Sequence, residues 1–235
     1  MVQQLVESTS TDTLPRMTFE EYRAWAVEHR HSEWVEGEVV EFMSVKLRHA
    51  LVVGFLGRLI GAVAELRQLG VVLGDPFAML IRTGNGEPRL TRQPDLLVVL
   101  SEHVDRLRDE WLEGPADLAI EVISDDSERR DRRVKLAQYA EVGVPEYWLV
   151  EGRAGRQGTE LYVRNPAGRY DRVSPDAEGR LYSTILPGFW LTEDWLAADP
   201  LPDVDDVLEA IVPNLPAVRA ERARRRRAAR ADRPS

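Results

Sequence analysis

The sequence contains no cysteine and only two lysines, and both shortages limit what the protein can be. Without cysteine it has no disulfide, no zinc site built on thiolates and no cysteine nucleophile. Of the 31 basic residues, 29 are arginine, so arginine has replaced lysine almost wherever either can serve. Lys46 and Lys135 are therefore candidates for positions that need a compact charge with a movable pKa. Chance survival of one lysine is the alternative.

Long hydrophobic runs are also missing. No stretch approaches the roughly 20 uninterrupted apolar residues that cross a bilayer. The most apolar segment, 50–64, is interrupted by Gly54, Gly57, Arg58 and Gly61. The N-terminus is polar and lacks the basic-then-apolar pattern of a signal peptide. We therefore expect a cytoplasmic protein that does not contact membranes.

Positive charge is scarce over most of the chain. The net charge is −9, but the segment 219–233 carries eight arginines against Glu221 and Asp232, a local charge of +6. The remainder therefore carries −15. An acidic body does not attract nucleic acid, which counts against a nucleic-acid enzyme, although the basic tail could partly offset this.

The order of the patterns predicts one main α/β domain with appendages. We expect a flexible arm over residues 1–16, a domain over 17–198, and an acidic linker with an Arg-rich helical tail over 199–235. Helices are predicted at 19–29, beginning with a Thr18–Glu21 capping box, at 45–69 with Gly70 as the C-cap, and at 127–142.

Strand patterns alternate with these helices. A hairpin is predicted over 32–43 with its turn at Glu36-Gly37, and further strands at 71–73, 77–81, 96–100, 117–123 and 146–150. Short strands at 161–164, 170–173 and 181–185 read as an antiparallel extension. A helix between two strands implies a βαβ crossover. The expected fold is a mixed central sheet flanked by helices.

Glu121 is the one charged residue in the otherwise apolar strand Leu118–Ile123. Side chains alternate across a strand, and both faces here are apolar apart from Glu121, so the strand should be covered on both sides. A buried carboxylate is costly unless it is paired or binds a metal. An ion pair with an arginine and a metal site are equally good explanations of this strand alone.

Asp95 follows Pro94 at the start of the apolar strand Leu96–Leu100. Alone, Pro-Asp is best explained as a turn. Together with Glu121 it is more informative, because two adjacent strands with one acid each could share a hard cation such as Mg²⁺.

Lys135 lies on the helix that follows Glu121, four residues after Asp131. An i,i+4 ion pair is the simple explanation. If the helix packs back over the sheet, Lys135 would instead reach the two carboxylates. There it could orient a water molecule or stabilise charge on a phosphate.

These residues resemble the PD-(D/E)XK nuclease superfamily, which has an Asp after Pro and then an acid, any residue and Lys. Here Glu121-Val122-Ile123 puts isoleucine in the lysine position. The sequence closely resembles one branch, the Uma-type restriction-endonuclease family, in which the lysine has moved to the following helix. The resemblance covers about 19–196. Its main signature comprises Asp117, Ile120-Glu121-Val122-Ile123-Ser124, Asp131, Lys135, Tyr139, Gly143-Val144 and Glu146-Tyr147-Trp148.

The segment Ser32–Glu38, followed by His49, resembles the same family's hairpin and helix motif, and 186–189 its closing turn. Glu38 could add a carboxylate around a metal, or simply lie beside a solvated turn. His49 could support catalysis, or be packed within its helix.

The resemblance implies a restriction-endonuclease-like fold and a metal-dependent endonuclease. Asp95, Glu121 and the Val122 carbonyl would bind Mg²⁺ or Mn²⁺, and Lys135 would position the attacking water. Nucleic acid, expected to be DNA, would be the substrate, and a homodimer would allow both strands to be cut. The alternative is an inactive nuclease-fold module that binds nucleic acid or a protein, as the acidic body and Ile123 suggest.

Overall fold

A computed structural model describes residues 16–29, 31–41, 46–124 and 127–231. Residues 1–15, most of the predicted arm, lie outside the described part. So do residues 30, 42–45, 125–126 and 232–235, and in the last helix the side chains of 225, 226 and 228–231.

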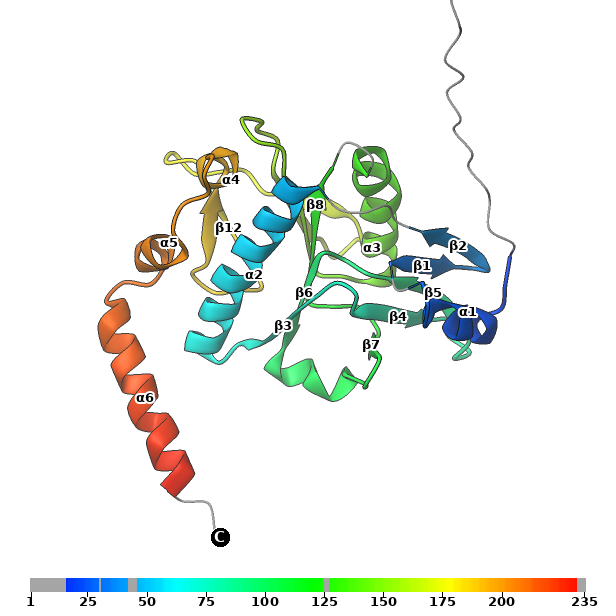
Figure 1. The fold of residues 1–235 in the computed structure, drawn as a ribbon, viewed down its shortest axis with the longest axis horizontal. Coiled ribbons are helices and arrows are strands. Elements are labelled where there is room, and N and C mark those ends of the chain that lie inside the picture. The colour runs from blue at the N-terminus through cyan, green and yellow to red at the C-terminus, as the bar shows by residue number, and fades with distance from the viewer. Residues whose placement is uncertain (1–15, 30, 42–45, 125–126, 232–235) are drawn as a thin grey trace, which may run out of the picture.

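Two larger sheets and one small sheet organise the strands (Figure 1). The central sheet has six strands in the order β11-β10-β9-β8-β6-β3, and its β8–β9 pair is parallel. Its strands are β3 (Gly70–Gly74), β6 (Leu96–Leu100), β8 (Leu118–Ile123), β9 (Glu146–Glu151), β10 (Glu160–Arg164) and β11 (Tyr170–Arg172). The predicted mixed sheet flanked by helices is confirmed.

The second sheet has five strands in the order β2-β1-β5-β4-β7, with β4 and β7 parallel. Its strands are β1 (Ser32–Val35), β2 (Glu38–Glu41), β4 (Ala78–Arg82), β5 (Pro88–Arg92) and β7 (Trp111–Glu113). The predicted hairpin forms β1 and β2, with Glu36 and Gly37 both at positive φ in its turn. The sequence patterns did not predict β5 or β7.

The extension differs from the expectation at its third strand. Strands β10 and β11 extend the central sheet as predicted, but β12 (Arg180–Tyr182) pairs with β13 (Trp190–Thr192) in a separate two-stranded sheet. A short helix, α4 (Glu193–Ala197), follows β13. The local pattern indicates a strand but does not say which neighbour it pairs with.

Strand β8 lies between two hydrophobic clusters, because its side chains alternate. Leu118, Ile120 and Val122 face the cluster that includes α2 (Leu47–Arg67). Ala119 and Ile123 face the cluster that includes Tyr139 of α3 (Leu136–Val142). Figure 1 shows α2 and α3 on opposite sides of this sheet. The strand is therefore covered on both faces, as its apolar sequence predicted.

The helix boundaries follow from local chemistry. Helix α1 (Phe19–Ala26) begins with the predicted Thr18–Glu21 capping box. Helix α2 ends differently from the prediction: Gln68, not Gly70, takes the left-handed conformation at φ 56°, and Gly70 already belongs to β3. The Gly70 prediction was wrong because the adjoining strand needs that residue, where a Cβ would lie 2.0 Å from the Val99 carbonyl oxygen.

Among the described helices, α2 alone is long and apolar enough to span a membrane. Its apolar side chains form a large part of the core instead, where seven are buried: Val52, Phe55, Leu56, Leu59, Ile60, Val63 and Ala64. Gly54 and Arg58 lie on its exposed side, whereas Gly57 and Gly61 are half-buried and a Cβ at Gly57 would contact Leu96.

Two helices follow residue 198. Within the predicted linker, α5 (Val204–Ile211) forms with Asp203 as its N-cap and packs against α2. Helix α6 (Leu215–Ala231) carries the Arg-rich segment and extends away from the body in Figure 1. A 3-10 helix, η1 (Ser101–Arg106), and a π-helical turn, η2 (Arg130–Lys135), complete the described elements.

Candidate active site

Glu121 projects from the middle of β8 toward the helix that follows the strand. Its side chain is 5% exposed, and its Oε1 lies 2.8 Å from the Nζ of Lys135. The Tyr139 hydroxyl donates to the same oxygen at 2.6 Å. Lys135 and Tyr139 are four residues apart, so they lie on one face of the helix. The sequence suggested an arginine as the ion-pair partner of Glu121, whereas in the structure the partner is Lys135.

A π-helical turn, η2, immediately precedes α3 and ends at Lys135. Such turns occur frequently at functional sites. Lys135 is buried, and besides Glu121 it lies 3.6 Å from Glu33 Oε1 and 3.7 Å from Asp131 Oδ1. The simple i,i+4 contact with Asp131 therefore exists, but the contact with Glu121 is shorter. The helix does pack Lys135 against a carboxylate of the sheet.

Asp95 sits just before β6, beside β8. Its Oδ2 accepts the Val122 backbone N–H at 2.6 Å, so the carboxylate is not merely part of a turn. Its Oδ1 lies 3.0 Å from Nε2 of His49, near the start of α2. Strand pairing of Leu96 with Ile120 places Asp95 at the level of β8 where Glu121 and Val122 lie. Both predicted acids and His49 thus meet at this part of the sheet.

Glu33 is a buried acid that sequence reasoning missed as a site residue. It is fully buried on β1, pairs with Arg92 at 2.7 Å and accepts the Gln93 N–H at 3.0 Å. It links the five-stranded sheet to Lys135. Glu33 precedes Trp34 and Val35 in the hairpin, and the resemblance of Ser32–Glu38 to the family's motif is the only signal that marked this segment.

The site holds more buried negative charge than its cations balance. Burial raises the pKa of Asp95 to about 7, despite the Val122 hydrogen bond and nearby Lys135. Burial likewise raises the pKa of Glu121 to about 8, with Asp131 and Asp95 adding to the effect against Lys135. Burial alone would lower the pKa of Lys135, but Glu121, Glu33 and Asp131 outweigh it and hold that pKa above its usual value.

His49 contributes no charge at neutral pH. Burial is the main cause that lowers its pKa, and Asp131 opposes this only partly. Its Nε2 lies 3.0 Å from Asp95 Oδ1 but makes no hydrogen bond there.

Mg²⁺ or Mn²⁺ fits this donor set. Among the described residues, Asp131 Oδ1 is buried without a hydrogen-bond donor. Burial raises the pKa of both Asp95 and Glu121, and a cation beside them would offset the cost of burying their charge. Within the same residues no three carboxylate or imidazole groups form a complete metal cluster. Mg²⁺ commonly takes only one or two protein carboxylates and completes its shell with water and phosphate oxygens, so two acids suffice.

Glu38, the remaining sequence candidate, lies apart from this cluster. Glu38 is 67% exposed on β2 and pairs with Arg16 at 3.0 Å, so the simple explanation of a residue beside the turn holds. Ile123, in the usual lysine position, is 1% exposed in the hydrophobic cluster with Tyr139. Its side chain cannot replace the lysine. Glu146 and Trp148 hydrogen-bond to each other at 2.6 Å and brace β9.

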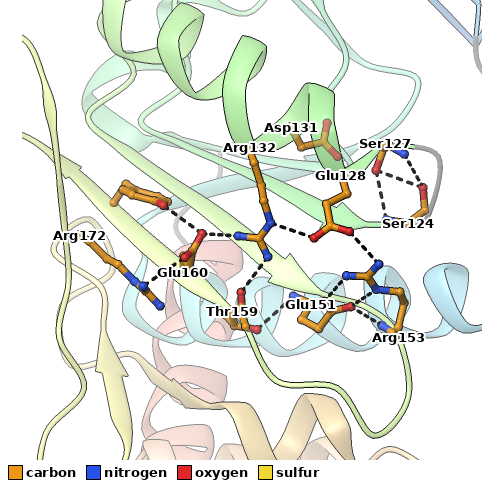
Figure 2. A network of polar contacts seen from close by, with 12 residues as sticks. Ser124, Ser127, Glu128, Asp131, Arg132, Glu151, Arg153, Thr159, Glu160 and Arg172 are labelled. Atoms are coloured by element: carbon orange, nitrogen blue, oxygen red, sulfur yellow. Dashed lines mark hydrogen bonds and ion pairs between the residues drawn. The ribbon is translucent and has the colours of Figure 1, made fainter.

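A second polar network secures the helix that carries Asp131 and Lys135 (Figure 2). Glu128 joins Arg132 at 3.2 Å and Arg153 at 2.9 Å, and Arg153 also contacts Glu151 at the end of β9 at 2.6 Å. Ser124 and Ser127 hydrogen-bond across the start of the helix. These contacts join the helix start to the carboxyl end of the sheet.

Comparisons with known proteins identify the fold and the family. The crystal structure of a "putative nuclease belonging to DUF820" from Anabaena variabilis shares the fold, with a TM-score of 0.59 and 14% identity over 83% of this chain and 99% of that one. The sequence matches the Uma2 family, described as "Putative restriction endonuclease", over residues 19–194. The chain belongs to this family, as its motifs predicted. No curated protein matches it.

Proposed function

We propose that the protein is a metal-dependent nuclease that hydrolyses phosphodiester bonds, with DNA as the expected substrate. Family membership and the nuclease-like fold support the class of activity. The observation that carries the proposal is the contact between Lys135 and Glu121 on a central strand. One of only two lysines in the chain meets the one acid of that strand.

Asp95, Glu121 and the Val122 carbonyl would hold the ion. When bound, Mg²⁺ or Mn²⁺ would supply positive charge at the scissile phosphate and lower the pKa of a water molecule. The Val122 N–H orients Asp95, with His49 close beside it, and the Tyr139 hydroxyl orients Glu121. Lys135, kept protonated by the surrounding acids, would orient the attacking water and stabilise negative charge on the phosphate.

Thermal melting tests the metal site without requiring turnover. Wild type and Asp95→Asn/Glu121→Gln are melted in EDTA and in millimolar Mn²⁺. We expect Mn²⁺ to raise the melting temperature of wild type only, because binding to the folded state alone is stabilising. An equal response of both proteins would contradict the assignment of the ligands.

Cleavage of plasmid DNA and of RNA, with Mg²⁺, Mn²⁺ or EDTA, tests the activity. Glu121→Gln and Lys135→Met should lose at least about a hundredfold in rate, the order expected when a charge-stabilising group is removed. The matched control Glu38→Gln should keep the wild-type rate, because Glu38 lies on the exposed hairpin. Circular dichroism and melting confirm that each variant is folded.

A melting temperature that does not respond to Mn²⁺, together with no cleavage of any substrate, would instead favour the inactive binding module. The family resemblance also leads us to expect a homodimer in the cytoplasm. Light scattering of the full chain measures the oligomeric state directly.

A further inference from the structure

Helix α6 joins a tethered first half to a strongly basic second half. Leu215 is buried in the main core, and Val218 packs against it. Arg219 pairs with Asp205 at 2.7 Å, and Arg222 pairs with Glu65 at 2.6 Å. These contacts fix the beginning of the helix to α5 and α2, so the direction in which the rest extends is set by the body.

Beyond Arg222 the sequence continues as Ala-Arg-Arg-Arg-Arg-Ala-Ala-Arg. Arg224 and Arg227 are exposed, and the helix extends away from the body (Figure 1). The run 224–227 places four positive charges within about one helical turn. The rest of the chain carries −15, so this run is the longest unbroken stretch of positive charge in the sequence.

We propose that this half of α6 binds the phosphodiester backbone of nucleic acid and holds the substrate at a distance from the active site. This inference rests on the proposed nuclease function and identifies how an acidic protein can retain a polyanion. Arginine pairs with phosphate through two parallel hydrogen bonds.

The composition of the helix argues against its other uses. After Val218 its only apolar residues are alanines. A helix that lies on a membrane needs Trp, Phe or Leu along its apolar face, and a coiled coil needs large apolar residues at a and d positions. Neither pattern is present, whereas phosphate binding needs only the charges. The helix also has no pattern for reading bases, so binding should not depend on sequence.

The tail and the candidate active site lie at opposite ends of α2. His49 contacts Asp95 near the start of this helix, and Glu65 holds Arg222 near its end. His49 and Glu65 are 16 positions apart in the sequence, which corresponds to about 24 Å along the helix axis. The tail therefore acts on substrate affinity and not on the chemical step. Its loss should raise KM while kcat stays unchanged.

The test measures binding of a labelled 30-base-pair DNA duplex by anisotropy, in EDTA and at 50–200 mM KCl. One variant changes the four arginines 224–227 to glutamine, and the matched control changes them to lysine. The glutamine variant should lose about tenfold or more in affinity. The slope of its log binding constant against log salt concentration should become shallower by up to about 0.9 for each arginine removed. The lysine control should retain most of both. A DNA duplex of unrelated sequence should bind equally. The same measurement with an RNA duplex shows whether the tail distinguishes the DNA backbone from the RNA backbone.

Unchanged affinity and salt dependence in the glutamine variant would overturn the proposal. So would tail-dependent pelleting with phosphatidylglycerol vesicles in place of DNA binding, or a tail-dependent change of mass in solution. Because binding is measured without metal, its failure is distinguishable from failure of the nuclease assignment, which the cleavage assay addresses.

Discussion

Asp95 shows most clearly that burying an ionised carboxylate in this site reduces stability. Its pKa is about 7 in the folded protein against the usual 3.8. Between these values the folded state holds the proton more tightly than the unfolded state, so the free energy of unfolding falls as pH rises from about 4 to 7. At most roughly 4 kcal/mol is lost in this window.

Urea unfolding in EDTA between pH 5 and pH 8 tests this pH dependence. Asp95→Asn keeps an oxygen for the Val122 N–H but cannot ionise, so its stability should change less with pH than that of wild type. Millimolar Mn²⁺ should restore wild-type stability at pH 8, because a bound cation replaces the proton. An identical pH dependence in both proteins would show that Asp95 does not carry the effect.

The residues that the sequence could identify are those with an unusual context. Lys135 is marked by the rarity of lysine, and Glu121 by its apolar strand; the structure brings them within 2.8 Å. Glu33 has neither signal. Its partner Arg92 lies 59 residues away in the sequence, in a sheet whose pairing the local sequence does not encode. The catalytic roles of Lys135 and Glu121 stay predictions.

At the scale of the elements, local pattern predicted strands by their apolar content. This worked for β6 and β8, both of which are almost wholly buried. It missed β5, which begins with proline and includes Arg89 and Arg92. Arg92 is buried because it pairs with Glu33, an interaction that only the folded chain creates. Strand β7 was missed because it has only three residues.

The parallel pair β8–β9 depends on a glycine directly after β9. A Cβ at Gly152 would lie 2.5 Å from Val122 Cγ1 and 3.0 Å from the Ile123 carbonyl oxygen. Gly152→Ala should therefore cost about 1–3 kcal/mol through overpacking and shift the part of β8 beside the site. Cleavage should fall as well, because Val122 orients Asp95.

Gly54→Ala is the matched control for this substitution. It lies on the exposed side of α2 with nothing within 4 Å of the added Cβ, so alanine should stabilise the helix by about 0.5–1 kcal/mol. Urea denaturation measures both variants. Equal stability of the two would mean that the backbone at Gly152 adjusts without cost.

For the whole molecule, the position of the C-terminal boundary decides which truncations fold. The sequence predicts a domain ending at residue 198, because the acidic stretch that follows resembles a linker. The structure packs Val207, Leu208 and Ile211 of α5 into the core beside α2. The segment resembles a linker in sequence because the exposed side of α5 is acidic, although its opposite side is apolar.

We therefore expect a chain cut after residue 198 to be severely destabilised, and one cut after Val218 to stay folded. Each of the three buried α5 side chains contributes roughly 1.5–3 kcal/mol, and a typical domain has only about 5–15 kcal/mol in total. The cut after 218 keeps every one of these contacts and removes the arginine run. It should melt near the wild-type temperature and lose DNA affinity. If the chain ending at 198 melts like wild type, α5 is dispensable and the domain ends where the acidic composition placed it.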